Sequence, residues 1–369
     1  SSVAAAIGPT VSFQSVVGNP REVLSAFEQE WQKRWQRHEE TKAEKWQPII
    51  DFAKHALPKR QTTFPAITSQ LWQKTVAKKR KNAAVGPDGV SRRDMLEMPS
   101  AAVDDMVALI HAIEEGAPWP QQLVTGHVAA LAKSADAQTV SQYRPICVFP
   151  LPFRCWGTIR AKQCLRYLAT FAPCTLMGNM PKRSPRHTGF HVQQLIEHSY
   201  CHDTEVAGGV IDIVKCFNML PQQPLLEIAS HLGIPSEVLQ PWHAALRQLQ
   251  RRFQVQGCVG RSLTSSCGFA EGDAMSVVAM AVCNVVCDMW MYFRYPSVRV
   301  WSFVDNIETV AQSAQDALNS VRALEEFCSL LDLETDPAKT FCWSTSSSGR
   351  KLILEHDQNR KYFARDLGG

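Results

Sequence analysis

Several features that would mark a specialised class of protein are missing from this sequence. Its 12 cysteines include no CxxC pair of the kind that binds zinc, and no uninterrupted segment reaches the roughly 18 apolar residues of a membrane span. No signal-peptide pattern opens the chain. We therefore expect no membrane partner and an intracellular, reducing compartment, in which the cysteines are small buried hydrophobes.

The net charge of the chain excludes few classes of binding partner. The 39 basic and 35 acidic residues give a formal net charge of +4, so total charge is weak support for a polyanionic partner. The distribution says more, because three basic clusters precede residue 190. One such cluster is usually a solvated face, but three favour a surface that contacts phosphates. The clusters are Lys74 with Lys78, Lys79, Arg80 and Lys81; Arg154 with Arg160, Lys162 and Arg166; and Lys182 with Arg183 and Arg186.

What is present is an ordinary globular composition. With 45% hydrophobic and 20% charged residues, a chain of 369 residues can form two or three subdomains around substantial cores. It does not begin with Met and it stops at LGG, so we expect a fragment of a longer protein. Two histidine pairs at i, i+4 spacing have no carboxylate at metal-site spacing, which favours a helix surface over a metal site. They are His187 with His191 and His198 with His202.

The first half of the chain is predicted to be mainly helical. Residues 21–56 have apolar and aromatic residues at helical spacing, which predicts one long or two shorter amphipathic helices before Pro58. A further helix is expected through Lys81, followed by a Gly-Pro turn and Ser91 as an N-cap. Helices are also expected over 101–115 and 153–170, with extended segments at 126–133 and 141–150 between them.

From residue 206 the pattern changes to strands that alternate with helices. Residues 206–221 predict a strand, an acid and a turn into a helix, 222–250 a helix broken at GIPS, and 251–266 a hairpin. A Gly-rich loop leads, within 268–293, into a long apolar helix that must be buried. A strand with Asp305, a helix over 313–331 and a strand near 336–344 follow. This order predicts the α+β fold class.

Asp305 has an unusual setting for an acid. It follows the apolar run at 300–304, where an unpaired charge costs several kcal/mol. One interpretation is a turn, because Asp-Asn often joins the strands of a hairpin. Asp212 supports another, because it also ends an apolar strand, and two such carboxylates side by side would hold Mg²⁺ through oxygen ligands. Two metal ions at that point would support in-line nucleotidyl transfer.

The order of short motifs resembles the fingers and palm of a reverse transcriptase, an RNA-directed DNA polymerase, of the non-LTR retrotransposon and group II intron type. NAAVGPDGVSRRDML resembles the aGPDGi segment, HVAALAK with QYRPICVF the paired fingers motifs, and LMGNMPKRSPRHTGFHVQQLIE the next fingers motif. IDIVKCFNMLP resembles motif A, GFAEGDAMS motif B, SFVDN motif C, LDLETDPAKT motif D and RDLGG motif E. The resemblance covers roughly residues 70–369. Each motif is weak alone, but their shared order makes chance similarity remote.

The resemblance implies a right-hand polymerase with an antiparallel palm sheet backed by helices and a thumb that is missing or incomplete. Residues 1–70 would be a largely helical N-terminal extension and 71–205 the fingers. Residues 206–222 would be palm with motif A, 223–262 connecting helices and a hairpin, and 263–369 palm with motifs B to E. The implied activity joins a dNTP to a primer 3′-hydroxyl, with an RNA template and a DNA or RNA primer as partners.

The resemblance also implies roles for single residues. Asp212 and Asp305, with Asn306, would bind two Mg²⁺ ions, for which Mn²⁺ can substitute. Lys339 would be a general acid near the leaving pyrophosphate. The nucleotide-binding residues would be Lys133, Arg144, Glu271, Gly272 and Phe217, the last as the steric gate that excludes a 2′-hydroxyl. Template or primer contacts would come from Gly268, Asp273, Ser276, Arg183, Leu367 and Gly368.

Departures from the family pattern leave alternatives open. Asn306 stands where motif C has a second Asp, which removes one charge. Glu271 stands where motif B has Gln, and a carboxylate beside a triphosphate is unfavourable unless it is paired. Cys216 and Asn218 replace the usual Ala and Asp beside the gate. One alternative is therefore a catalytically inactive domain that serves as an RNA- or protein-binding scaffold. Another is an RNA-dependent RNA polymerase, against which the bulk of Phe217 argues.

Overall fold

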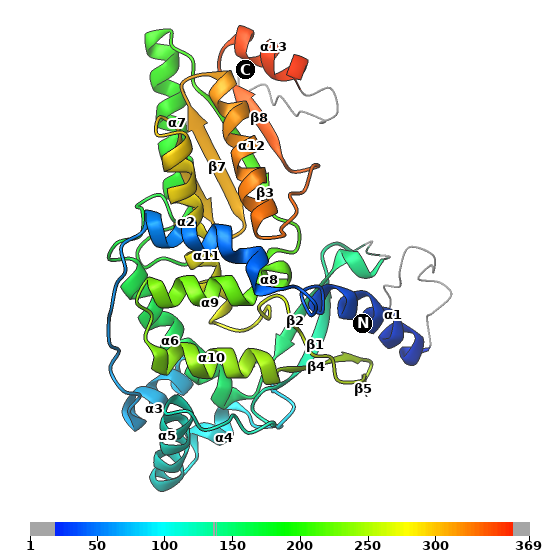
Figure 1. The fold of residues 1–369 in the computed structure, drawn as a ribbon. Helices are drawn as coiled ribbons and strands as arrows, with labels where there is room; N and C mark the ends of the chain where they lie inside the picture. Colours follow the sequence, from blue (N-terminus) through cyan, green and yellow to red (C-terminus); the bar gives the residue numbers. More distant parts are fainter. Residues whose placement is uncertain (1–18, 136, 138, 357–369) are drawn as a thin grey trace. The chain divides into compact units, whose positions relative to one another are not determined.

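The computed structural model describes residues 19–135, 137 and 139–356, and its architecture is α+β (Figure 1). The chain divides into two compact units built from separate stretches. Of the described residues, the first unit contains those up to Ala43, Lys59–Gln163 and Phe217–Ser276, and the second contains Glu44–Pro58, Cys164–Cys216 and those from Val277 onward. Within the described residues, each unit has a four-stranded sheet of its own.

The elements have the following bounds. The α-helices are α1 Pro20–Trp35, α2 Gln47–Ala56, α3 Ser69–Ala77, α4 Arg92–Leu96, α5 Ser100–Glu114, α6 Leu151–Leu168, α7 Pro185–His202, α8 Cys216–Met219, α9 Gln222–His231, α10 Ser236–Gln248, α11 Ser276–Arg294, α12 Ala314–Leu330 and α13 Ser347–His356. The strands are β1 Thr125–Ala132, β2 Tyr143–Val148, β3 Ala207–Asp212, β4 Gln250–Val255, β5 Cys258–Val259, β6 Arg299–Phe303, β7 Asn306–Ala311 and β8 Phe341–Ser344. Short 3₁₀ helices lie at Ala43–Trp46 and Val140–Gln142.

The sheet of the first unit has the order β2-β1-β4-β5, with β1 antiparallel to β2 and parallel to β4. Aromatic residues of α1 pack on it at helical spacing. The rings of Phe27 and Trp35 stack on Phe253 of β4 at centroid distances of 5.2 and 5.7 Å, and Trp31 lies 5.4 Å from Trp35. All four rings are at most 1% exposed. Helix α1 is therefore part of the hydrophobic core of this unit.

The sheet of the second unit is antiparallel, with the order β6-β7-β3-β8. Its central strand β3 has glycine at two successive positions where neighbouring groups come very close. A Cβ on Gly208 would lie 2.4 Å from the Thr309 carbonyl oxygen, and one on Gly209 would lie 2.2 Å from Cγ2 of Val321. Glycine therefore allows β3 to lie close to both β7 and α12.

Helices cover both faces of this second sheet (Figure 1). On one face, α12 packs on β3 and β7, and the hydroxyls of Thr309 and Ser320 are 2.8 Å apart. On the other face, Leu195 and Ile196 of α7 pack against a buried cluster that includes Trp301 and Val310. The strands thus have two buried faces, which explains their high content of apolar and β-branched residues.

Helix α11 is the apolar helix that the sequence predicts between the Gly-rich loop and β6. By length and composition it is the one helix among residues 19–356, with positions 136 and 138 set aside, that could cross a membrane. However, 72% of its apolar window is buried inside the protein, which is typical of a core helix. This burial agrees with the expectation that the long apolar helix lies in the core.

Most expected elements lie where the sequence predicts them. Residues 21–56 form two helices, the 222–250 helix breaks between α9 and α10, and the side chain of Ser91 caps α4. Of the cysteines, all free, nine are buried, and only Cys174, Cys201 and Cys258 are exposed. The four histidines of the two pairs are exposed on α7, as expected.

Two expected boundaries are wrong. The helix predicted through Lys81 ends at Ala77, because Lys79 turns inward and donates to the Thr158 hydroxyl at 2.7 Å and to the Arg154 carbonyl at 3.3 Å. Asp305 is not carried by a strand: β6 ends at Phe303 and β7 begins at Asn306, so Asp305 lies in the turn. The turn interpretation of Asp-Asn is therefore confirmed.

Candidate catalytic site

Asp212, the last residue of β3, is paired across the sheet with the first residue of β7, in the segment that resembles motif C. In the antiparallel register of β3 and β7, Asp212 lies opposite Asn306, and the amide of Ile213 donates to the carbonyl of Asp305 at 3.4 Å. Directly opposed residues of an antiparallel pair share one face of the sheet. The structure therefore brings together Asp212, Asp305 and Asn306, although more than 90 residues separate Asp212 from the other two in the sequence.

The turn that carries Asp305 has an unusual backbone. Val304 and Asp305 form a two-residue loop between the paired residues Phe303 and Asn306, and Val304 has a φ of 59°. A positive φ at the first loop residue is typical of glycine, and it costs a β-branched residue of the order of 1–2 kcal/mol. Two contacts hold the turn: the Asn284 amide donates to the Val304 carbonyl at 3.0 Å, and the backbone of Gly178 packs closely on Val304. Such stored strain is common at functional sites.

Lys339 connects the loop before β8 to this acid group. Its ammonium donates to Oδ2 of Asp212 at 2.7 Å and lies 3.7 Å from Asp336. The hydrogen bond to Asp212, with added attraction from Asp336 and Asp305, raises the pKa of Lys339 above its usual value. Lys339 is therefore protonated at neutral pH, and its charge balances the local excess of carboxylates.

Two further acids near this group were not predicted from the sequence. The amide of Asp336 donates to the carbonyl of Asp212 at 2.8 Å, so Asp336 anchors the Lys339 loop to the end of β3. The Asp-Pro pair at 336–337, which is typical of a turn, is the signal that could have identified it. Glu308 lies two residues after Asn306 on the same strand, and burial raises its pKa to about 6. Strand alternation places Glu308 on the same face as Asn306.

The donor set suits a hard divalent cation. Asp212, Asp305 and Asn306 offer carboxylate and amide oxygens, which Mg²⁺ prefers, and neither Cys nor His is among them. Across residues 19–356, with 136 and 138 excepted, no group of three or more His, Cys, Asp and Glu side chains is placed to hold a metal. One or two carboxylates are nevertheless the usual protein share of a Mg²⁺ site that substrate phosphates complete.

A second set of predicted residues belongs to the first unit. Arg144 on β2 lies opposite Leu131 on β1, and the amide of Lys133 donates to the carbonyl of Gln142 at 2.9 Å. Lys133 follows the last residue of β1, and its bond to Gln142 continues the β1–β2 register by one pair, which places Lys133 on the same face as Leu131 and Arg144. Both basic side chains are exposed. The structure thus groups these two cations on one exposed face of a strand pair.

Glycines hold the motif B loop close to its neighbours. Gly272 has a φ of 111° and a Cβ there would lie 2.2 Å from the Cys147 carbonyl oxygen, while Gly268 has a φ of 77° and a Cβ would meet the Asn218 carbonyl at 2.2 Å. Neither position tolerates a side chain. The carbonyl of Glu271 also accepts the amide of Cys147 at 2.7 Å, which fixes the loop to β2.

Other polar residues of this loop point inward. Asp273 is 9% exposed and accepts the Met275 amide at 3.0 Å, and Ser276 is 2% exposed and donates to the Ala270 carbonyl at 2.8 Å. Burial raises the pKa of Asp273 to about 6. These hydrogen bonds are thus internal to the loop, and a direct contact with template or primer stays a prediction for both residues.

The basic clusters are partly structural. Arg160 is 2% exposed and forms a two-pronged ion pair with Glu114, at 2.5 and 2.7 Å. Arg183 donates to the carbonyls of Ala172, Pro173 and Leu176, and so organises its own loop. The expected phosphate-contacting surface can therefore include neither the Arg160 guanidinium nor the bonded groups of Arg183. The predicted contacts Leu367 and Gly368 lie outside the described residues.

Phe217 is half-buried, and its carbonyl accepts the amide of Phe269 at 2.6 Å. The boundary between the two units falls between Cys216 and Phe217. Asp212, Asp305, Asn306 and Lys339 thus belong to the second unit, whereas the proposed gate belongs to the first, together with Arg144 and Glu271.

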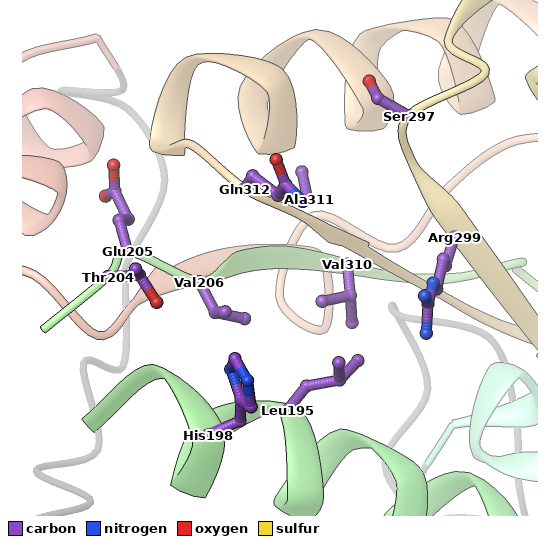
Figure 2. A pocket seen from close by; sticks show the side chains of 10 residues that line it. All are labelled: Leu195, His198, Thr204, Glu205, Val206, Ser297, Arg299, Val310, Ala311 and Gln312. Carbon is purple, nitrogen blue, oxygen red and sulfur yellow. The ribbon is translucent and has the colours of Figure 1, made fainter. Parts of the chain in front are cut away.

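A cavity of about 530 Å³ lies elsewhere in the second unit (Figure 2). It is bounded by α7, the start of β3 and the strand ends at Arg299 and Gln312. In the β3–β7 register these strand ends are opposite to the end that carries Asp212. Leu195 and Val310 form its apolar wall, and His198 and Glu205 are its nearby polar groups. No predicted site residue lines this cavity, so it is separate from the acid group.

No protein-family model matches the chain, and no curated protein matches it. The resemblance to reverse transcriptases therefore rests on the sequence motifs and on the positions of their residues.

Proposed function

We propose that this chain is the fingers and palm portion of a reverse transcriptase, which extends a primer 3′-hydroxyl with dNTPs on an RNA template. The observation that carries the proposal is the pairing of Asp212 on β3 with Asn306 on β7. Asn306 directly follows Asp305, which lies in the turn between β6 and β7. Acids at the ends of neighbouring strands are what two-metal nucleotidyl transfer requires. The antiparallel sheet order β6-β7-β3-β8 gives further support for a palm.

In this proposal, Asp212, Asp305 and Asn306 would hold two Mg²⁺ ions. Bound there, the ions would supply activation of the primer hydroxyl and charge balance for the pyrophosphate. Lys339, kept protonated by Asp212, can supply a proton to the leaving group. Lys133 and Arg144 bind triphosphate oxygens from their shared strand face, and the guanidinium of Arg144 can do so with two parallel hydrogen bonds. Phe217 restricts the space beside the sugar and so selects deoxynucleotides.

A second candidate function is a catalytically silent scaffold that binds RNA or protein. One observation favours it: the Lys339 ammonium lies 2.7 Å from Oδ2 of Asp212, so a lysine occupies an oxygen that a metal ion needs. Asn306 adds to this, because it supplies one negative charge less than a second Asp would. Under this interpretation the strand-end acids are a balanced ion-pair cluster, and the chain binds RNA without extending a primer.

Primer extension decides between the two functions. On poly-rA with oligo-dT, we expect the parent protein to incorporate dTTP in Mg²⁺. Asp212→Ala and Asp305→Ala should each reduce extension by at least about a hundredfold, or ~3 kcal/mol of transition-state stabilisation. Asp105→Ala, at an exposed position on α5, is the matched control and should extend like the parent. Activity that survives either change at the acid group would contradict the assignment.

A further inference from the structure

The end of α1 is hydrogen-bonded to two residues that flank the proposed nucleotide site. The indole Nε1 of Trp35 donates to Oδ1 of Asn218 at 2.9 Å, and Nδ2 of Asn218 donates to Oε1 of Glu271 at 2.5 Å. Trp35 and Asn218 are each 1% exposed, so water does not compete for the bond between them, whereas Glu271 is half-buried. Asn218 directly follows Phe217, and Glu271 directly precedes Gly272.

The indole decides which way the Asn218 amide faces. An indole N–H is a donor only, so the atom of residue 218 that faces Trp35 must be an acceptor. Oδ1 therefore points to Trp35 and the NH₂ group points to residue 271. Residue 271 must then present an acceptor, which a carboxylate does in either rotamer. With a carboxylate at position 218, both side-chain oxygens would be acceptors, and residue 271 would have to be a donor such as Gln.

The negative charge of Glu271 has a cationic neighbour in the same core. Arg251 is 1% exposed, and its guanidinium lies 4.3 Å from the Trp35 ring centroid. Burial lowers the pKa of Arg251 to about 10, while Glu271 and Asp273, together with two cysteines, act in the opposite direction. The Glu271 carboxylate is thus hydrogen-bonded to Asn218, and its charge is one of those that keep Arg251 protonated.

Backbone bonds connect the same three segments. The Trp35 carbonyl accepts the amides of Ser266 and Cys267 at 2.8 and 3.0 Å. Along the loop, the amide of Gly268 donates to the Leu220 carbonyl at 2.9 Å, two residues after Asn218. The end of α1, the segment after Phe217 and the motif B loop are therefore one hydrogen-bonded assembly within the first unit.

We propose that Trp35, Asn218 and Glu271 form a positioning relay. Trp35, at the end of α1, determines which residue of the 218/271 pair donates and which accepts. This pair in turn positions the adjacent Phe217 and Gly272. Asn218 and Glu271 stand where the resembled family has Asp and Gln, so the two departures are one reciprocal exchange of amide and carboxylate. The positioning role of the relay rests on the proposed function, whereas the donor–acceptor order of Asn218 and Glu271 does not. Trp35, in the segment before the fingers, thus becomes part of the support for nucleotide selection.

The test is a reciprocal exchange in the full chain. Asn218→Asp alone removes the donor and sets two carboxylates face to face, so we expect the melting temperature to fall by roughly 5 °C. Adding Glu271→Gln restores a donor opposite the introduced carboxylate, and we expect most of that loss to be recovered. Glu271→Gln alone should be mild, because its Oε1 can still accept from Asn218. A double variant no more stable than Asn218→Asp would overturn the relay.

Catalysis gives the second readout. The dNTP kcat/KM should fall on the order of tenfold in Asn218→Asp, and the preference for dNTP over rNTP should weaken. The kcat/KM for dNTP and the preference for dNTP over rNTP should both return to parent values in the double variant. Trp35→Phe keeps a ring beside Arg251 but removes the indole donor, so it should weaken the sugar preference, whereas Trp31→Phe, one helical turn earlier, should not. Recovery of melting temperature without recovery of sugar preference would overturn the positioning role.

A surface pair controls for the charge change itself. Gln193 donates to Glu197 at 2.8 Å on the exposed side of α7, and Gln193→Glu should change melting temperature and sugar preference little. If the parent protein does not extend any primer, the proposed function fails. The melting-temperature cycle still decides the order of the pair, because that readout does not depend on catalysis.

Discussion

In the proposed reverse transcriptase, Asn306 is the metal-site residue that departs from the family pattern in its charge. It lies opposite Asp212, and its amide donates to Oδ1 of the neighbouring Asp305 at 3.3 Å. An amide oxygen can coordinate Mg²⁺ but adds no negative charge. Asn306→Asp should therefore strengthen metal binding, and extension at limiting Mg²⁺ should rise by about tenfold for each ~1.4 kcal/mol recovered in the transition state.

A Mg²⁺ titration of primer extension measures this effect. The gain should shrink at saturating Mg²⁺, since the parent site is then filled as well. Mn²⁺ should partly replace the substitution, because it binds nitrogen and oxygen sites more tightly than Mg²⁺. An equal gain at all Mg²⁺ concentrations would show that residue 306 acts on something other than metal affinity.

The raised pKa of Asp273 predicts that the stability of the protein depends on pH. Burial raises its pKa from 3.8 to about 6, in spite of the nearby cations Arg251 and Lys79. Below pH 3.8 the carboxyl is neutral in both the folded and the unfolded state. Between about pH 4 and 6 only the unfolded state ionises, so the free energy of unfolding falls as the pH rises. Above about pH 6 both states are ionised, and a constant cost of up to about 3 kcal/mol remains.

Asp273→Asn removes this titration and keeps an oxygen for the Met275 amide. It should therefore raise the free energy of unfolding by up to about 3 kcal/mol at about pH 7.5 and by little at about pH 4. Urea unfolding at several pH values measures the difference, with the exposed Asp105→Asn as the control. A gain that does not depend on pH would mean that Asp273 is not the titrating group.

At the scale of elements, the packing of β3 against its neighbours determines where Asp212 lies. Gly208 is opposite Val310, and an added Cβ would lie 2.4 Å from the backbone oxygen of Thr309. A backbone oxygen cannot move aside without disturbing the β3–β7 ladder. Gly208→Ala should therefore destabilise the protein by about 1–3 kcal/mol and should lower extension, because Asp212 is four residues along the same strand.

Gly189 is the matched control for this change. It lies within α7, and a Cβ there would meet nothing within 4 Å. Gly189→Ala should stabilise the helix by about 0.5–1 kcal/mol and leave extension unchanged. Urea unfolding of both variants measures the two effects. Equal stabilities for Gly208→Ala and the parent would show that β3 and β7 can separate without loss.

The elements that the sequence predicts well are those with local signals. The apolar pattern of α11, the GIPS break between α9 and α10, and the strand that ends at Asp212 all follow from periodicity and from turn residues. These signals do not depend on the rest of the chain. The order of the motifs also predicted that Asp212 and Asp305 belong to one site. In the β3–β7 register, Asp212 lies opposite Asn306, the residue after Asp305.

What could not be predicted depends on contacts between distant residues. The bond from Lys339 to Asp212 spans 127 positions, and the bond from Asn218 to Glu271 spans 53. The early end of α3 follows from the burial of Lys79 against α6, which no local pattern contains. The positive φ of Val304 is a further example, since propensity favours glycine there and tertiary contacts hold a valine.

At the scale of the whole molecule, the charge distribution bears on the proposed template binding. The net charge is only +4, Arg160 is buried and Lys79 is bonded internally, so the proposed binding must rely on the exposed basic side chains. Arg144 and Lys133 are exposed and share a strand face. Affinity for an RNA–DNA hybrid should therefore depend on salt, falling by about tenfold or more between roughly 50 and 200 mM KCl as counterion release predicts.

The last prediction separates template binding from catalysis in one set of proteins. The double variant Asp212→Ala with Asp305→Ala should bind the hybrid within about twofold of the parent and with the same salt dependence, because phosphate contacts come from basic residues. It should extend at background, whereas the parent extends. Binding by fluorescence anisotropy and extension on the same hybrid measure both. If parent and Asn306→Asp bind the hybrid yet extend in neither Mg²⁺ nor Mn²⁺, the acids serve only the ion pair with Lys339, and the scaffold function stands.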